Sequence, residues 1–221
     1  MNGAKDIRSY GYKVGSIPCG KANLITDVPG VKVGHCTVEE NGHKTGVTAV
    51  IPCDGNVFVK KPVASVFTLN GYGKTAGTIQ IEELGVIETP ICLTNTLNVG
   101  KVHDALVSVM LDWCKRDGVP LSSVNPVVME CNDSSLSDIA QRPVGEAEVR
   151  AAITNASADF AEGDVGAGRG TTCYGMKGGI GSSSRLMQIG DETFTMGVLV
   201  QSNYGSSADF QFAELPEGLA E

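Results

Sequence analysis

Residues 91–114 have the sequence ICLTNTLNVGKVHDALVSVMLDWC, which predicts a buried strand followed directly by an amphipathic helix. The first four residues are apolar apart from one threonine. From Val99 onward, apolar side chains recur at the three- and four-residue spacing of a helix, with lysine and aspartate between them. Asn98 is well placed to cap the start of this helix, which we expect over residues 99–114.

Several other segments have the composition of strands or helices. Further strands are expected at residues 47–51, 63–69, 126–129 and 194–201, which are rich in β-branched and apolar residues. Shorter helices are expected over residues 75–84, before Gly85, and around Val149 and Ala152. Because strands outnumber helices and several are apolar on both faces, the pattern favours stacked sheets covered by helices, an α+β fold, over a doubly wound nucleotide-binding fold. No repeat or charge block divides the chain, so a single domain is expected over residues 1–221.

Charge and cysteine content restrict the class of protein. The formal net charge is −8 and lysine and arginine form no cluster, so nucleic acid and anionic membranes are unfavourable partners. The seven cysteines form no CxxC pair, which is typical of reduced, mostly buried thiols. No apolar run reaches the length of a membrane span, and polar residues follow Met1. We therefore expect a cytoplasmic protein that acts on a small molecule or peptide.

The three histidines do not predict a metal site. His35, His43 and His103 lack the spacing of zinc ligands. No Gly-x-Ser-x-Gly motif supports a serine-histidine-aspartate triad. Structural or surface roles are the simpler interpretation of these residues.

Residues 164–185, DVGAGRGTTCYGMKGGIGSSSR, have the most unusual local composition in the chain. Gly166, Gly168 and Gly170 do not have the GxGxxG spacing of a dinucleotide fingerprint. The later part, with Gly175 and Lys177, misses the phosphate-loop pattern by one residue. A glycine-rich turn that packs against neighbouring strands is the simpler interpretation.

Two predicted strands end in polar residues that could carry chemistry. Residues 130–138, ECNDSSLSD, follow one apolar strand, and residues 197–205, GVLVQSNYG, form and end another. Glu130 could hold a positively charged amino group, and Asn203 could donate a hydrogen bond to an oxyanion. Taken separately, these segments are better explained by an Asx-type cap before Leu136 and by a polar strand end that leads into a turn.

Five blocks, in order along the chain, connect these segments. They are ITDVPGVKVGH from Ile25, LNGYGKTAGTIQIEELG from Leu69, LTNTLNVG from Leu93, residues 130–138, and the glycine-rich run that leads to LVQSNYG. With these blocks the chain resembles, over nearly its whole length, the family of L-aminopeptidase/D-alanine esterase-amidases and β-peptidyl aminopeptidases. The same superfamily contains ornithine acetyltransferase.

The resemblance implies a precursor that cleaves its own backbone before a serine or threonine, which then acts as an N-terminal nucleophile. It also implies a four-layer αββα sandwich shared with a separate β chain. Assemblies of the family are homo-oligomers of αβ units, often tetramers, and need no metal or organic cofactor. The nucleophile is expected some tens of residues beyond Asn203, and therefore on the β chain, with the present chain as the α subunit.

The resemblance also implies roles for individual residues. Asn203 matches the oxyanion-stabilising asparagine, and Glu130 matches the acid that receives the substrate's terminal ammonium. Asn95, Tyr72 and Asn132 lie in matched blocks and are expected to contribute to substrate binding. The chain departs from the family pattern at Ser134 and Ser135, and at Lys74, where an acid is common.

The implied function is hydrolysis of an amide or ester bond next to a free amine, in small peptides, amino-acid amides or β-peptides. Acyl transfer is an alternative within the same superfamily, since an amine can replace water as the acceptor. A non-catalytic binding protein that keeps the fold is an alternative from a different class. Product analysis with an added amine distinguishes hydrolysis from acyl transfer. The presence of a β chain distinguishes either enzyme from the non-catalytic binding protein.

Overall fold

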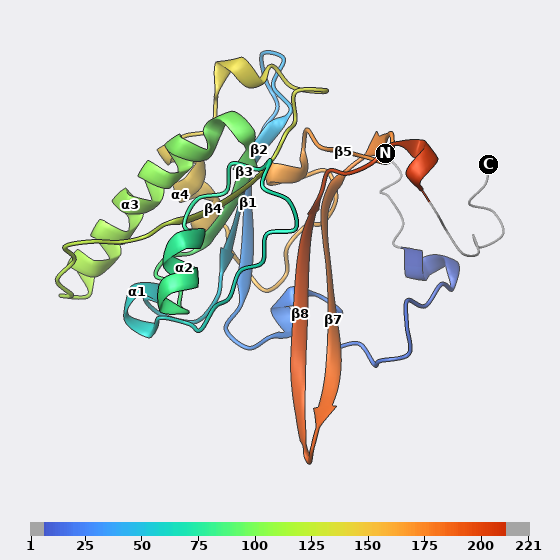
Figure 1. The fold of residues 1–221 in the computed structure, drawn as a ribbon, viewed down its shortest axis with the longest axis horizontal. Coiled ribbons are helices and arrows are strands. Elements are labelled where there is room, and N and C mark those ends of the chain that lie inside the picture. Colours follow the sequence, from blue (N-terminus) through green and yellow to red (C-terminus); the bar gives the residue numbers. More distant parts are fainter. Residues whose placement is uncertain (1–6, 211–221) are drawn as a thin grey trace.

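The computed structural model describes residues 7–210, and a four-stranded sheet with the strand order β1-β2-β3-β4 lies at its centre (Figure 1). The strands are β1 Lys32–Val38, β2 Thr45–Ile51, β3 Ile91–Asn95 and β4 Val127–Cys131. β2 is antiparallel to both β1 and β3, whereas β3 and β4 are parallel. Every residue of β2 is buried, so the sheet is covered on both faces.

Two helices, α3 Val99–Arg116 and α4 Glu146–Thr154, cover one face of this sheet (Figure 1). Leu106 of α3 and Val149 of α4 are fully buried in one cluster with Val47 of β2 and Val128 of β4. The helices predicted around residues 99–114 and around Val149 are therefore confirmed. None of the helices in the described part of the chain is both long and apolar enough to cross a membrane.

Two shorter helices, α1 Val57–Lys60 and α2 Thr78–Leu84, pack at one end of the sheet. Their buried residues Val57 and Ile81 form a cluster with Val127 of β4. α2 ends at Leu84, and its C-cap residue Gly85 has a φ of 66°, the left-handed conformation that glycine adopts readily. The helix predicted over residues 75–84 thus exists but begins three residues later, at Thr78.

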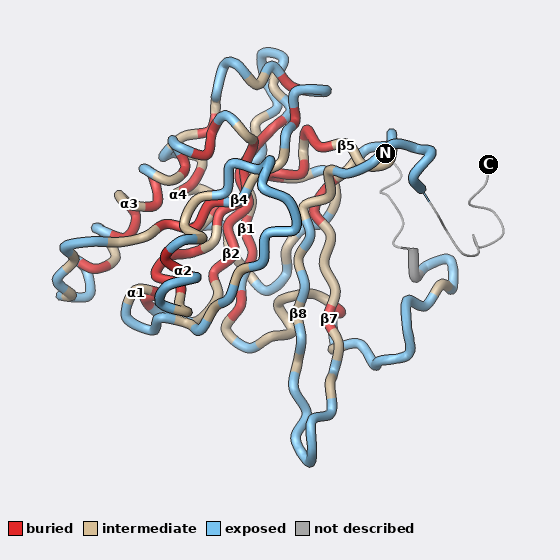
Figure 2. The backbone as a smooth tube through the Cα atoms, viewed as in Figure 1, coloured by how far each residue is buried: buried red, intermediate tan, exposed pale blue. Residues whose placement is uncertain are grey.

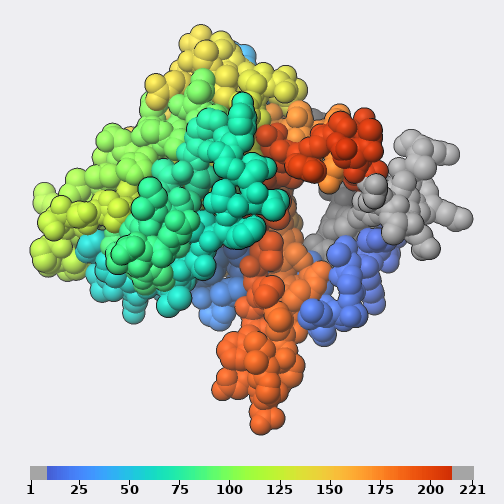
Figure 3. All heavy atoms as spheres, viewed as in Figure 1, coloured from blue at the N-terminus to red at the C-terminus, as the bar shows by residue number. Residues whose placement is uncertain are grey.

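The opposite face of the sheet is contacted by the base of a long hairpin, β7 Gly179–Ile189 and β8 Glu192–Ser202. Leu199 of β8 packs against a cluster that includes Val50 and Leu93. Away from this base the hairpin projects from the body of the molecule and is largely exposed (Figures 2 and 3). A short ribbon, β5 Thr172–Cys173 and β6 Met176–Lys177, precedes it. The mixed helix and strand content agrees with the expected α+β class, and a single domain over residues 1–221 stays a prediction.

The strand predicted over residues 63–69 is wrong. The segment is extended, but its only pairing among the described residues is an isolated bridge between Val63 and Val86. Phe67 and Leu69 are more than four-fifths exposed. Apolar composition alone does not make a strand, because a ladder also needs a neighbouring backbone.

Four strands were not predicted: β1, β5, β6 and β7. β7 overturns the interpretation of the glycine-rich run as a turn throughout. The glycines of this region allow backbones to approach closely. A Cβ on Gly179 would lie 2.5 Å from the Gly163 carbonyl oxygen, and one on Gly178 would lie 2.5 Å from that of Ser202. Glycine is therefore required by contacts between distant segments.

Candidate functional site

Glu130 lies near the end of β4, where both of its carboxylate oxygens accept a hydrogen bond. The Thr96 hydroxyl donates to Oε2, and the backbone N–H of Lys74 donates to Oε1 across 3.0 Å. Thr96 is available because β3 runs parallel to β4, with Thr94 opposite Glu130. The side chain remains partly exposed. A carboxylate has further lone pairs, so Glu130 can accept additional donors from a ligand while its orientation is fixed.

Residues 70–75 form a loop over Glu130. A Cβ on Gly73 would lie 3.4 Å from Oε1 of Glu130, so this backbone is in contact with the carboxylate. Tyr72 is 87% exposed. The Lys74 ammonium donates to the Tyr72 carbonyl oxygen across 2.5 Å and lies 4.1 Å from the centroid of its ring. Tyr72 therefore belongs to the loop that contacts Glu130 through Gly73 and Lys74, and its contact with substrate stays a prediction.

The side chains of Asn95 and Asn132 both make hydrogen bonds within the described chain. Asn95 is 1% exposed; its amide nitrogen donates to the Thr45 hydroxyl across 2.9 Å, and its oxygen accepts the backbone N–H of Asn98. Asn98 is the N-cap residue of α3, as predicted, but its own side chain makes no capping bond. The Asn132 oxygen accepts the backbone N–H and the hydroxyl of Ser134, which is an Asx turn. Contact of either residue with substrate stays a prediction.

Asn203 directly follows β8 and is half-buried. Its side-chain oxygen accepts the backbone N–H of Thr172 across 3.2 Å. The amide nitrogen makes no hydrogen bond with any residue of 7–210. Because the oxygen is occupied, the two remaining N–H donors are directed away from Thr172 and are available to another group.

The end of β4, the glycine-rich run and the end of β8 meet. The Cys131 thiol donates to the Gln201 carbonyl oxygen across 3.6 Å, and the Gln201 amide donates to the Ala167 carbonyl oxygen across 2.9 Å. A Cβ on Gly170 would lie 2.7 Å from the Cβ of Asp133. The segments that contain Glu130 and Asn203 are therefore in direct contact, which links the two polar strand ends that the sequence presents separately.

Lys177 holds the glycine-rich run through its ammonium. It donates to the carbonyl oxygens of Gly168, Thr171 and Gly178 across 2.8, 3.0 and 2.9 Å, and pairs with Asp164 at 3.2 Å. In a phosphate loop, backbone N–H groups and a lysine face an anion. Here backbone carbonyls face the lysine, so this geometry favours a structural role for the run over phosphate binding.

Asp133, in the polar segment of residues 130–138, is a buried acid. It is 1% exposed, and neither carboxylate oxygen has a hydrogen-bonding partner among the described residues. Burial raises the pKa of this carboxyl, while the nearby side chains of Thr45 and Asn95 oppose the shift. No local sequence signal distinguishes it from an exposed turn aspartate, since its neighbours Thr45, Asn95 and Gly170 lie far from it along the chain.

Cys131 lies beside Glu130 and could be mistaken for a nucleophile. Burial and the adjacent charges of Glu130 and Asp133 raise the pKa of its thiol to about 12. A cysteine nucleophile needs the thiolate form. Cys131 is therefore protonated at neutral pH and unsuited to attack a substrate.

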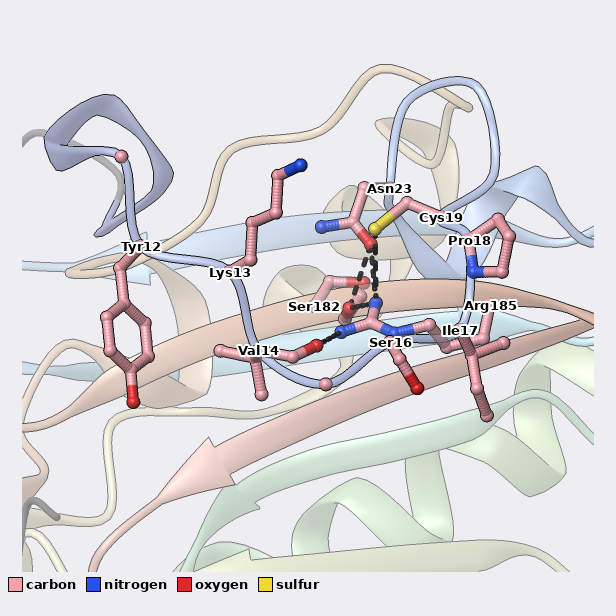
Figure 4. Close-up of a pocket in the computed structure, with 13 residues that line it drawn as sticks. Tyr12, Lys13, Val14, Ser16, Ile17, Pro18, Cys19, Asn23, Ser182 and Arg185 are labelled. Carbon is pink, nitrogen blue, oxygen red and sulfur yellow. Dashed lines mark hydrogen bonds between the residues drawn. The ribbon is translucent and has the colours of Figure 1, made fainter.

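A cavity of about 680 Å³ lies elsewhere, between residues 11–19 and β7 (Figure 4). The Arg185 guanidinium reaches across it to the Val14 carbonyl oxygen and the Asn23 side chain, at 3.0 Å each. The cavity shares no lining residue with the site around Glu130 and Asn203. Its size alone gives no reason to place the reaction there.

The chain is similar to known peptidases in sequence. The sequence model of peptidase family S58 matches residues 23–221. Beta-peptidyl aminopeptidase BapA from Sphingosinicella xenopeptidilytica is 38% identical over 213 residues, which cover 90% of this chain and 52% of that protein. The chain therefore spans about half the length of the curated relative it matches.

Solved structures show the same similarity. The PH0078 protein from Pyrococcus horikoshii OT3 matches with a TM-score of 0.90 and 46% identity, over 96% of this chain and 63% of that one. The L-aminopeptidase D-Ala-esterase/amidase from Ochrobactrum anthropi matches with a TM-score of 0.82 and 37% identity, over 90% of this chain and 58% of that one. Its structure is described as a variant of the Ntn hydrolase fold.

Proposed function

Since the chain belongs to peptidase family S58, we propose that it is the α subunit of a self-cleaving aminopeptidase whose nucleophile lies on a separate β chain. The substrates are small peptides, amino-acid amides or β-peptides with a free terminal amine. The observation that carries the proposal is the Glu130 carboxylate, which is fixed at both oxygens and remains partly exposed. Such a group is suited to hold a substrate ammonium in one place.

Catalysis in this proposal divides between the two chains. The serine or threonine at the start of the β chain attacks the substrate carbonyl, and its own α-amine takes up the hydroxyl proton. The Asn203 amide nitrogen donates to the oxygen that becomes negatively charged. The amine leaves with the transferred proton, and water then releases the acyl group. In the described chain, Asn203 is supported for this role by its unoccupied N–H donors and its oxygen bound to Thr172.

The exposed apolar face of the β7–β8 hairpin is the reason to propose that a further chain segment packs against it. Phe194, Met196, Val198 and Val200 alternate along β8 and are each about half exposed. A two-stranded hairpin is at best marginally stable alone, and alternate residues of a strand lie on one face. Additional strands of the β chain would cover this face and complete the second sheet of a four-layer αββα sandwich, in homo-oligomers of αβ units.

Intact-mass spectrometry of the full-length protein that carries this chain, under denaturing conditions and with N-terminal sequencing, tests self-processing. We expect two polypeptides in equal amount, the second beginning with serine or threonine. Replacement of that residue by alanine is expected to leave one uncut polypeptide. A single polypeptide from the unaltered gene would contradict the proposal.

The amine requirement is tested on the same preparation. We expect release of β-alanine from β-alanyl-alanine and none from its N-acetyl derivative, because acetylation removes the ammonium that Glu130 binds. Equal hydrolysis of both substrates would show that Glu130 does not select the free amine. Formation of a new amide with an added amine would favour acyl transfer instead.

A further inference from the structure

We propose that the Lys74 ammonium binds the C-terminal carboxylate of a short peptide whose amino group lies at Glu130, so that the enzyme prefers dipeptides over the corresponding amides. This inference rests on the proposed function and specifies its substrate class. A dipeptide with both ends free carries one positive and one negative charge. Glu130, in β4, and Lys74, in the loop over it, carry the opposite charges.

The first step of the argument is the position of Lys74. Its backbone N–H donates to Glu130 Oε1, so the lysine side chain begins one hydrogen bond away from the carboxylate. No ion pair joins the two residues among the described side chains. The backbone of Lys74 therefore contacts Glu130, while its ammonium is directed to Tyr72 and does not pair with the carboxylate.

The second step is the way in which the ammonium is held. One of its three donors goes to the Tyr72 carbonyl oxygen at 2.5 Å, and the charge lies 4.1 Å from the centroid of the Tyr72 ring. Both contacts reduce the freedom of a long exposed side chain, and neither supplies a negative charge. The remaining donors have no acceptor within the described part of the chain, so they are available to a carboxylate.

The third step is distance. Two residues of extended chain span about 7 Å, and the Lys74 ammonium lies within one hydrogen bond and one lysine side chain of Glu130. A dipeptide can therefore reach both groups at once. A longer peptide would place its carboxylate beyond Lys74, so the preference is expected to fall as the peptide lengthens.

The experiment measures kcat/KM for β-alanyl-alanine and β-alanyl-alanine amide with the processed full-length enzyme, following the β-alanine that both release. We expect the dipeptide to be preferred about fivefold, which is the size of one partly exposed charge pair. Lys74→Met and Lys74→Gln are expected to abolish the preference through a higher KM for the dipeptide. Lys74→Arg is expected to retain it. Glutamine keeps a donor for the Tyr72 carbonyl, so its agreement with methionine identifies charge as the cause.

Lys115→Met, which removes an exposed charge at the end of α3, is the matched control and is expected to leave the preference unchanged. Higher ionic strength is expected to reduce the preference of the unaltered enzyme. This inference would be overturned if the Lys74→Met enzyme preferred the dipeptide as strongly as the unaltered enzyme does, or if the unaltered enzyme showed no preference. The aminopeptidase proposal would stand in either case. Failure of both substrates, and of other small peptides and amino-acid amides with a free amine, to release their N-terminal residue would overturn both proposals.

Discussion

The backbone N–H of Thr172 donates to the Asn203 side-chain oxygen across 3.2 Å, and this contact fixes which end of the amide is free. Oxygen and nitrogen of an amide are equivalent in shape but opposite in hydrogen bonding. With its oxygen bound to Thr172, Asn203 presents donors to the surrounding space. Thr172 lies in the ribbon that follows the turn held by Lys177. The glycine-rich run therefore acts on the site by orienting Asn203.

Replacing Asn203 with alanine is expected to lower kcat by about 10²–10³, the usual loss for one oxyanion donor, with little change in KM. The reason is that the developing charge exists only in the transition state. Steady-state kinetics on β-alanyl-alanine measures both constants. Asn155→Ala, which removes an exposed amide bound to the His35 carbonyl, is the control and should keep kcat within about twofold. A rise in KM alone would assign Asn203 to substrate binding instead.

Glu130→Gln is expected to lower kcat/KM by about 10–100-fold, mainly through KM, because a charge-assisted hydrogen bond to the ammonium is lost. Thr96→Val, which removes the donor to Oε2, should cost about fivefold, and Thr96→Ser should recover that loss. Glu82→Gln, on the exposed side of α2, is the matched control. If Glu130→Gln hydrolysed the free-amine substrate as well as the unaltered enzyme, the ammonium would have to bind elsewhere.

Because Asp133 is buried, we expect the free energy of unfolding to fall as pH rises. Burial raises the pKa of its carboxyl above the ordinary value of 3.8, so the folded state holds this proton more tightly than the unfolded state. The stabilisation that comes from this tighter proton binding is complete below pH 3.8 and is lost as pH rises through the folded-state pKa. Asp133→Asn removes the buried charge and is expected to stabilise the protein by roughly 1–3 kcal/mol at pH 7.

Thermal unfolding between pH 4 and pH 8 checks this expectation. The difference in Tm between Asp133→Asn and the unaltered protein should grow with pH, whereas Asp138→Asn, at an exposed position nearby, should give no such trend. A Tm lowered equally at every pH would mean that the folded state needs the Asp133 oxygens as acceptors.

Elements with a local pattern were predictable from the sequence, and so was the family. Residues 99–114 repeat apolar side chains at helical spacing, and α3 buries those side chains against the sheet. The ordered sequence blocks gave the family resemblance, which the match to peptidase family S58 over residues 23–221 confirms. The same blocks identified Glu130 and Asn203 as site residues, whose roles stay proposals.

Contacts between distant segments were not predictable. β7 contains glycines and serines that have low strand propensity, and it becomes a strand by pairing with β8. Residues 63–69 have the composition of a strand but lack a partner among the described residues. The donors to Glu130 come from Thr96 and from the backbone of Lys74, and a backbone N–H leaves no mark in a sequence pattern.

Gly170 and Gly181 provide a direct test of the close packing behind the site. A Cβ at Gly170 would lie 2.0 Å from the Lys44 carbonyl oxygen and 2.7 Å from the Cβ of Asp133, whereas one at Gly181 would meet nothing within 4 Å. Neither glycine has the positive φ that would itself disfavour alanine. Gly170→Ala is therefore expected to destabilise the protein by about 3 kcal/mol, since the backbone of Lys44 must move.

For a protein of this size that loss corresponds to a Tm lower by roughly 6–12 °C. Gly181→Ala is expected to change stability by less than about 1 kcal/mol, and a small increase is favoured because alanine restricts the unfolded chain. Differential scanning calorimetry of the two variants measures both Tm values. Similar Tm values would mean that Gly170 does not lie against Lys44 and Asp133, and the close packing of the glycine-rich run against the end of β4 would then be wrong.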